Sequence, residues 1–383
     1  MALSKIETAS LDIGQLGGRR NLIINGAMQV AQRGTSSTAI TGINVCDRWV
    51  VNGAAFSWDT TQNSLTSSDA PYQYGFRKSL KTENTSAGSA STSYQLIRHQ
   101  IEAQNVAQSG WEYTNPNSYL VLSFWAKSSV AGTYHYHIRT EDGTSQMFIG
   151  SVTLASNVWK KVELSIPGNS NITVNNDNGT GLNLNWYVHL GTNYSGSIST
   201  ETWTTYQGGF QTPDYTQDWG NTLGATFELT GVQLEVDHSG TGQASPFEHR
   251  SYGEELALCQ RYFYTPLQDS RAQYQINFTQ GSGSSGWTNF QVPFPVSMRV
   301  SPSLTHNIAD SNRVTAAPNA DEWCFYLQNQ GYASKQGASN ASVFNADTTL
   351  NYAIVGAYYV SPSSDASGII LGSGLTFEFS AEL

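Results

Sequence analysis

The chain has 383 residues, which is long enough for two or three compact units, each with a hydrophobic core. Only 13% of the residues are charged, against roughly 25% in an average soluble protein, while 12% are aromatic. Aromatic residues and Thr suit β-strands, and Asn, Ser and Gly suit turns, so the composition argues against a disordered chain and against a helical bundle. The net charge of −10, without a long Lys/Arg cluster, argues against nucleic acid as a partner.

The N-terminal segment, residues 1–20, is polar and holds few large apolar side chains. Such a segment buries too little surface to order itself, so we interpret it as an attachment arm that a partner orders. It lacks the apolar core of a signal peptide. A membrane span requires about 18 consecutive apolar residues, and the sequence contains no such stretch. We therefore expect synthesis in a cytoplasm and no membrane insertion.

The next segment, residues 21–248, alternates apolar and polar residues with turn clusters about every dozen residues, which predicts an all-β domain. The clearest strand pair is 119–126 and 132–139, separated by a short polar turn. Further strands are predicted at 148–154, 158–166, 182–190 and 226–236. Antiparallel strands with this spacing favour a β-sandwich of the jelly-roll type.

A short helix is predicted within residues 249–265. Ser251 and Glu254 have the S-x-x-E spacing of a capping box, and Leu256, Cys259 and Phe263 follow at helical spacing. We expect this helix to link two domains.

The C-terminal segment, residues 266–383, returns to strand-like patterns between loops rich in Gly, Ser and Asn. These patterns predict a second, smaller β-sandwich. Its strands are predicted at 272–279, 287–292, 325–328, 350–360 and 375–379.

Five stretches of the chain together resemble the fibre and appendage proteins of tailed bacteriophages. These stretches are NLIINGAMQVAQRGT at 21–35 with DRW at 47–49, LSFWAK at 122–127, GVQLEV at 231–236, PFEHRSYGEELALCQRYF at 246–263 and VPFPVSMR at 292–299. The resemblance implies a jelly roll like those of carbohydrate-binding modules at 21–248, a linking helix, a C-terminal β-sandwich and a homotrimer on the surface of a virion. It also implies that residues 1–20 attach the protein to another virion protein.

An aromatic segment between predicted strands is our candidate glycan site. Sugars are recognised by flat apolar rings together with carboxylates or amides, and residues 202–219 supply both. The alternative is that these rings pack over the sandwich or against another subunit. The candidate residues are Trp203, Tyr206, Tyr215, Trp219, Asp214 and Asp218.

No metal centre or cofactor is predicted. His135 and His137 share one face of a strand, but a third ligand is not identifiable nearby. The segment 175–179 offers oxygen ligands for a structural calcium ion, but it lacks the spacing of a calcium loop, so an ordinary Asn-rich turn is the favoured interpretation and calcium the alternative. The three cysteines, Cys46, Cys259 and Cys324, are too widely spaced for a zinc site.

Two further groups of polar residues are interpreted as structural. Asp47 and Arg48 would pin the first strand beside a buried Trp49, and Arg250 and Glu254 would do the same at the junction.

Three functions remain open on the sequence. The leading hypothesis is a tail fibre or receptor-binding appendage of a virion that adsorbs to host-surface polysaccharide or lipopolysaccharide without being an enzyme. The second is a capsid decoration or head fibre protein with a structural role. The third is a polysaccharide depolymerase, for which Asp214 and Asp218 are the only carboxylate pair beside the aromatic segment.

Overall fold

The computed structural model describes residues 20–38, 45–55, 57–88, 90–266, 272–275, 277–280, 285–306, 323–327, 331–333, 345–360, 366–371 and 377–383. The predicted attachment arm lies outside the described residues, except for Arg20. The described part forms two compact units that divide between Leu256 and Ala257, within the helix predicted to link the domains. No helix in the described ranges is long and apolar enough to cross a membrane.

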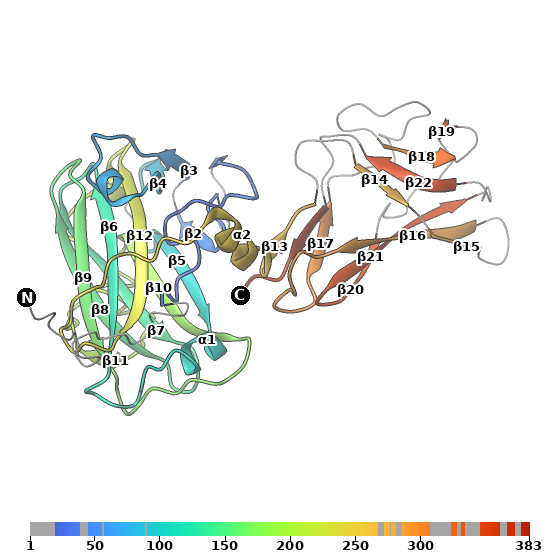
Figure 1. Cartoon of the computed structure of the whole chain (residues 1–383). Coiled ribbons are helices and arrows are strands. Elements are labelled where there is room, and N and C mark those ends of the chain that lie inside the picture. Colours follow the sequence, from blue (N-terminus) through green and yellow to red (C-terminus); the bar gives the residue numbers. More distant parts are fainter. Residues whose placement is uncertain are drawn as a thin grey trace, which may run out of the picture. The chain divides into compact units, whose positions relative to one another are not determined.

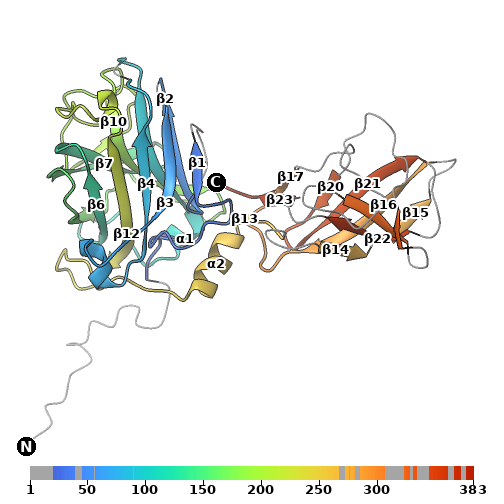
Figure 2. The same cartoon turned by 90° about the horizontal axis from the view of Figure 1, so that it is seen from above.

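Unit 1 is an antiparallel β-sandwich of two sheets with six strands each, drawn in blue through yellow in Figures 1 and 2. The first sheet has the strand order β1, β3, β4, β12, β6, β9. Its strands are β1 (Ser36–Thr38), β3 (Trp58–Ser64), β4 (Lys78–Asn84), β12 (Thr226–Asp237), β6 (Tyr119–Ser128) and β9 (Lys160–Pro167).

The second sheet of unit 1 has the strand order β11, β8, β7, β10, β5, β2. Its strands are β11 (Trp203–Thr205), β8 (Gln146–Leu154), β7 (Gly132–Thr140), β10 (Thr180–Leu190), β5 (Tyr94–Glu102) and β2 (Trp49–Ala54). Short helical turns connect the strands of unit 1, namely η1 (Ala70–Tyr74), α1 (Ala103–Ala107) and η2 (Trp219–Asn221).

The all-β prediction is confirmed, but the predicted pairing of 119–126 with 132–139 is wrong. These segments form β6 and β7, which belong to different sheets: β6 pairs with β12 and β9, and β7 pairs with β10 and β8. Sequence alternation shows which residues face the core, but it does not show which strand is the neighbour. Here the connection between the strands crosses from one layer of the sandwich to the other.

Aromatic side chains fill the space between the two sheets of unit 1. The ring of Phe124 lies 4.9 Å from Tyr136 and 5.5 Å from Trp186, and Trp49 lies 5.6 Å from Trp186. All four side chains are buried. Tyr136 comes from β7 and faces inward, on the opposite face of the strand from His135 and His137.

A bulge in β12 marks the GVQLEV segment. Its register against β6 shifts between Thr230 and Gln233, and Gly231 adopts a φ of 62°. A Cβ on Gly231 would lie 2.7 Å from the ring of Phe76, so both the conformation and the space require glycine.

Helix α2 (Tyr252–Gln260) begins at the predicted capping box. The Ser251 backbone N–H donates to Glu254 Oε2 at 2.9 Å, and the Glu254 N–H donates to Ser251 Oγ at 3.3 Å. The Ser251 hydroxyl, which donates to Glu254 Oε2 at 2.8 Å, and the Ser251 backbone N–H together hold the pKa of the Glu254 carboxyl below its usual value. Helix α2 ends before Phe263, which instead begins strand β13 (Phe263–Tyr264).

The described residues of unit 2 form three antiparallel sheets. The first contains β13, β23 (Phe377–Ser380) and β17 (Ser303–His306). The second contains β14 (Ala272–Gln275), β22 (Ala366–Leu371), β18 (Trp323–Leu327) and β19 (Gly331–Ala333). The third contains β15 (Asn277–Gln280), β16 (Ser285–Pro293), β21 (Tyr352–Val360) and β20 (Asn345–Thr348).

The predicted strand 272–279 is thus two strands, β14 and β15, which pair with β22 and β16 in separate sheets. Within the VPFPVSMR segment, Phe294 and Met298 are buried, and the Phe294 ring lies 5.0 Å from Phe379. This segment therefore contributes apolar side chains to the core of unit 2.

Candidate functional site

The outer face of the second sheet is polar and aromatic where an ordinary exposed sheet face would carry scattered charges. On β10, Asn185 and Tyr187 alternate with the core residue Trp186. On β5, Arg98 lies opposite Asn185, and Leu96 lies opposite Tyr187. Because β-strand side chains alternate between faces, these four residues share the outer face.

Segment 191–218 lies over part of this face. The Tyr215 hydroxyl donates to the Tyr187 carbonyl at 2.8 Å, and the Tyr187 hydroxyl donates to Gln211 Oε1 at 2.6 Å. The segment covers Tyr187 so well that the side chain is only 2% exposed. Burial raises the pKa of the Tyr187 hydroxyl well above its usual value.

Beside this segment, the outer face forms a hollow of about 230 Å³, which we call the tyrosine cleft. Its walls combine three tyrosine rings with amide and guanidinium groups. The wall residues are Asn52, Tyr94, Arg98, Tyr194, Tyr206 and Gln211. Leu96, Tyr187 and Leu190, all buried, form its floor.

The tyrosine rings of the cleft are held by neighbouring side chains. Tyr94 and Tyr194 meet edge to face, with ring centroids 5.7 Å apart. The guanidinium carbon of Arg139 lies over the Tyr206 ring, 4.3 Å from its centroid, and Arg139 Nε also donates to Glu141 at 2.6 Å. The cleft thus has aromatic walls whose orientation is fixed before any ligand enters.

Two buried histidines lie on the same outer face. His137 Nδ1 is 3.4 Å from the Gln211 carbonyl, and its Nε2 is 2.9 Å from Asn185 Nδ2. His135 Nδ1 is 2.7 Å from Ser151 Oγ. Burial lowers the pKa of His135 to about 4 and that of His137 to about 3, so both are neutral at pH 7.

The structure distributes the aromatic candidates from the sequence over several environments. Tyr206 lies in the wall of the tyrosine cleft. Tyr215, in segment 191–218, is half-buried, and its hydroxyl donates to the Tyr187 carbonyl. Trp203 is also half-buried: its Nε1 donates to the Pro167 carbonyl at 2.7 Å.

The expectation of an exposed ring is wrong for Trp219. Its side chain is 0% exposed and belongs to the core of unit 1. The polar residues around Trp219 made the segment look too polar for a core, but η2 turns this ring inward. A buried indole cannot stack on a sugar.

The two carboxylates of the candidate set are exposed and take part in local contacts. Asp214 accepts a hydrogen bond from Ser195 Oγ at 2.8 Å, and Asp218 accepts one from Asn221 Nδ2 at 2.6 Å. Neither carboxylate is in the lining of the tyrosine cleft. The first contact joins two distant parts of segment 191–218, and the second stabilises the turn at residues 218–221.

The residues considered for metal binding show local hydrogen bonds. The Asn175 N–H and Nδ2 donate to Asp142 at 2.8 and 2.7 Å, and the Gly179 N–H donates to Asp177 Oδ1 at 2.8 Å. Over the ranges that the structure describes, no group of three or more His, Cys, Asp or Glu could hold a metal ion. Calcium at 175–179, which would also use backbone oxygens, stays the alternative that these contacts do not test.

Asp47, Arg48 and Trp49 make structural contacts at the start of β2. Trp49 is buried and its Nε1 donates to the Asn25 carbonyl at 3.0 Å. Asp47 accepts from the Gln32 N–H at 3.0 Å, and Arg48 Nη2 donates to the Gln100 carbonyl at 2.8 Å.

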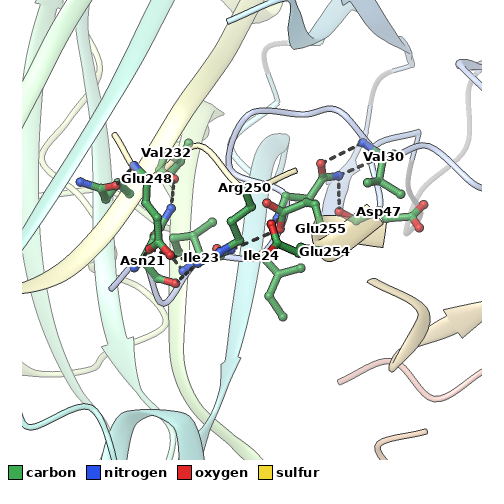
Figure 3. A network of polar contacts seen from close by, with 12 residues as sticks. Asn21, Ile23, Ile24, Val30, Asp47, Val232, Glu248, Arg250, Glu254 and Glu255 are labelled. Atoms are coloured by element: carbon green, nitrogen blue, oxygen red, sulfur yellow. Dashed lines mark hydrogen bonds and ion pairs between the residues drawn. The ribbon is translucent and has the colours of Figure 1, made fainter. Parts of the chain in front are cut away.

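Arg250 is the centre of a second structural network, shown in Figure 3. Its guanidinium donates to the Ile23 carbonyl at 3.1 Å and to the Asn21 carbonyl. It also forms ion pairs with Glu248 at 3.4 Å and Glu255 at 3.3 Å. Glu255 in turn accepts from the Asn25 N–H at 2.6 Å. The network ties the segment at residues 21–25 to the start of α2, within unit 1.

Two more hollows lie elsewhere on unit 1. One, of about 460 Å³, contains Trp203 and the exposed Phe210 in its wall. The other, of about 470 Å³, is lined by aromatic rings that include Tyr74, Trp125 and Phe247. Neither lining includes an arginine. Gln207 in the first hollow is the one side-chain amide of the two linings, whereas the tyrosine cleft has two amides and an arginine.

Sequence reasoning missed most of the tyrosine cleft. Three of its residues lie on strands that were not predicted, namely Asn52, Tyr94 and Arg98. Tyr194 precedes the chosen segment 202–219, and Gln211 lies in that segment but was not chosen as a candidate. A signal was present in β5, where Tyr94, Leu96 and Arg98 alternate with the inward-facing Ile97. This alternation would have placed Tyr94 and Arg98 together on the outer face of one strand.

No family model and no curated protein matches the sequence. The structure is similar to a family 11 carbohydrate-binding module from Clostridium thermocellum in complex with a β-1,3-1,4-mixed-linked tetrasaccharide, at 12% identity and a TM-score of 0.27, over 52% of this chain and 95% of that chain.

It is also similar to a cyclase from Fischerella sp. TAU, at 8% identity and a TM-score of 0.32, over 61% of this chain and 100% of that chain. A third similar structure is the N-terminal endo-1,4-β-D-xylanase 10B of Clostridium thermocellum, solved as its CBM22-1 and GH10 modules with xylohexaose, at 9% identity and a TM-score of 0.26, over 57% of this chain and 30% of that chain. These TM-scores are too low to transfer a ligand or an activity, so function has to be inferred from the cleft itself.

Proposed function

We propose that the protein binds a glycan in the tyrosine cleft without catalysing its cleavage. The observation that carries the proposal is the combination of three tyrosine rings with Asn52, Arg98 and Gln211 around one hollow. Aromatic faces pack on the C–H side of a pyranose ring, and amide and guanidinium groups match its hydroxyls. The hollow is large enough for about one sugar ring, with further rings of a chain outside it.

Preformed walls favour binding because fewer side chains lose freedom when the ligand enters. The Tyr94–Tyr194 contact and the Arg139–Tyr206 stack fix three of the rings that a sugar would touch. Neutral His137 and buried Tyr187 support the floor. These contacts support a binding site that is rigid at its base.

Tyr94→Ala tests the proposal. The full-length protein and the variant are compared on an array of bacterial surface polysaccharides and plant glucans, followed by titration calorimetry with the best-bound oligosaccharide. We expect Tyr94→Ala to weaken binding at least about tenfold, which corresponds to about 1.4 kcal/mol.

Tyr74→Ala is the matched control. Tyr74 is also a tyrosine of unit 1, 56% exposed, but it lines the aromatic hollow that contains Trp125. It should bind like the parent protein. A loss in Tyr74→Ala with unchanged binding in Tyr94→Ala would move the site to that hollow, and an array without any bound glycan would refute glycan binding.

We further propose that this binding serves a phage virion, as a tail fibre or receptor-binding appendage that adsorbs to host-surface glycan. The support for this setting is the resemblance of the five sequence stretches. Immunogold electron microscopy of virions with an antibody against residues 266–383 tests it. Gold at the tail tip is the expected result, gold over the capsid would favour a decoration or head fibre protein, and unlabelled virions would refute a place in the virion.

A homotrimer is part of the same proposal, because linked copies of a weak site raise avidity without new contacts. Light scattering of the purified protein should give three times the mass of one chain. A monomer at micromolar concentration would contradict it.

A further inference from the structure

Arg98 has an unusual position in the tyrosine cleft. Its side chain is half-buried on β5, and its Nε donates to Asn185 Oδ1 at 2.7 Å. Within the described part of the chain, this is the one hydrogen bond of its guanidinium, and it forms no ion pair there. Both Nη groups of Arg98 therefore remain as donors at the wall of the cleft.

The orientation of Arg98 is fixed by a relay of neutral groups. Asn185 Oδ1 accepts from Arg98, and Asn185 Nδ2 donates to His137 Nε2 at 2.9 Å. With Nε2 as the acceptor, the proton of neutral His137 is on Nδ1 and points to the Gln211 carbonyl. Each group in this relay supports its neighbour without supplying a negative charge.

The other charged groups near the cleft do not neutralise Arg98. Arg139, the second arginine of this face, forms an ion pair with Glu141 and stacks on Tyr206. His137 is neutral, and the raised pKa of the Tyr187 hydroxyl keeps it protonated. The cleft thus presents one uncompensated positive charge in a chain whose net charge is −10.

We infer that the tyrosine cleft selects glycans that carry an anionic substituent, a carboxylate or a phosphate ester, and that Arg98 binds this group. The inference rests on the proposed glycan binding and specifies its ligand. A guanidinium fork matches the two oxygens of a carboxylate or phosphate, and such charge-assisted hydrogen bonds are about twice as strong as neutral ones. Tyr94 and Tyr194 would hold the ring of the same sugar.

Matched pairs of polysaccharides test the inference by affinity electrophoresis with the full chain. The carboxylate pair is polygalacturonate and its carboxyl-reduced galactan, and the phosphate pair is yeast phosphomannan and the dephosphorylated mannan. We expect the acidic member of at least one pair to be bound at least tenfold more tightly than its neutral partner. The pair that shows the preference identifies the anionic group.

Arg98→Gln should abolish this preference by weakening binding of the acidic member to the level of the neutral one. Arg77→Gln is the matched control, because Arg77 makes the same charge change far from the cleft, where it stacks on Tyr72. It should keep the preference. In the parent protein, raising NaCl from 50 to 500 mM should weaken only binding of the acidic member, a readout that needs no variant.

Equal binding of both members in each pair, including no binding of any of them, would overturn the inference. So would a preference that Arg98→Gln retains. If neutral glycans on the array are bound and Tyr94→Ala abolishes this, glycan binding by the cleft stands and the anion preference alone fails. If Tyr94→Ala has no effect on any bound glycan, the cleft itself is refuted.

Discussion

Two arginines of unit 1, Arg250 and Arg98, have opposite surroundings. The Arg250 guanidinium donates to two backbone carbonyls and forms ion pairs with Glu248 and Glu255, and its side chain is 7% exposed. Arg98 is half-buried and is held by one neutral amide. A saturated guanidinium stabilises the fold, whereas one with free donors in a cleft is available to a ligand.

The largest effect on stability is expected from a substitution of Arg250. We expect Arg250→Met to lower the free energy of unfolding of unit 1 by about 3 kcal/mol, because Glu255, itself largely buried, then loses its ion pair. Urea denaturation followed by circular dichroism measures this. A loss below about 0.5 kcal/mol, as expected for an exposed ion pair, would remove the distinction between the two arginines.

The neutral relay behind Arg98 predicts a pH dependence of stability. The folded-state pKa values of His135 and His137, about 4 and about 3, are below the usual 6.5, so below pH 6.5 the unfolded chain binds protons that the folded chain does not. The free energy of unfolding should therefore fall by about 2.5 kcal/mol from pH 7.5 to pH 5.5, about half of it from each histidine.

Urea denaturation at both pH values measures this change. Three carboxylates with lowered pKa, Asp69, Asp237 and Glu254, lose their contribution to stability mainly below pH 4.5, which is outside this interval. His137→Gln should reduce the dependence and leave the contributions of His135 and of His189, whose pKa burial also lowers. Equal stability at both pH values in the parent protein would show that the histidines take up protons in the folded state.

The smallest effect on stability is expected from a substitution of Arg98. Arg98→Gln should lower the free energy of unfolding by only about 1 kcal/mol, because a single hydrogen bond, from the half-buried Arg98 to the buried amide of Asn185, is altered. The same urea denaturation measures it. A loss as large as that of Arg250→Met would assign Arg98 a structural role and weaken the case for an anionic ligand.

Much of the fold followed from local patterns. Alternation located β6, β7, β8, β9, β10 and β12 to within a few residues, and the Ser251–Glu254 spacing located the start of α2. Strands such as β2 and β5 were missed, because Trp49 to Glu102 mixes buried polar residues such as Gln95 and His99 into the inward face. A polar residue that is buried with hydrogen-bond partners leaves no mark in a hydrophobic pattern.

The candidate site was less accessible to sequence reasoning. Of the residues chosen there, Tyr206 lines the tyrosine cleft, while Trp219 is in the core. The cluster of aromatic residues in the sequence indicated an aromatic loop. The composition of a loop does not determine whether a given ring points into the core or into solvent. The direction depends on which strands the loop crosses, which is a property of the assembled sheets.

Local sequence patterns were sufficient for the class of fold, the capping of α2 and the inward or outward face of residues in the predicted strands, because these depend on neighbours within a few positions. The assembled structure was needed to show that β6 and β7 belong to different sheets and that β5, β10 and segment 191–218 enclose one cleft. The pairing of strands and the packing of a loop on a sheet join residues about 100 positions apart, as in Arg98 with Asn185 and Tyr94 with Tyr194. Which strands pair and where the loop packs depend on the apolar surface that the whole sandwich buries, and a local sequence pattern does not contain this information.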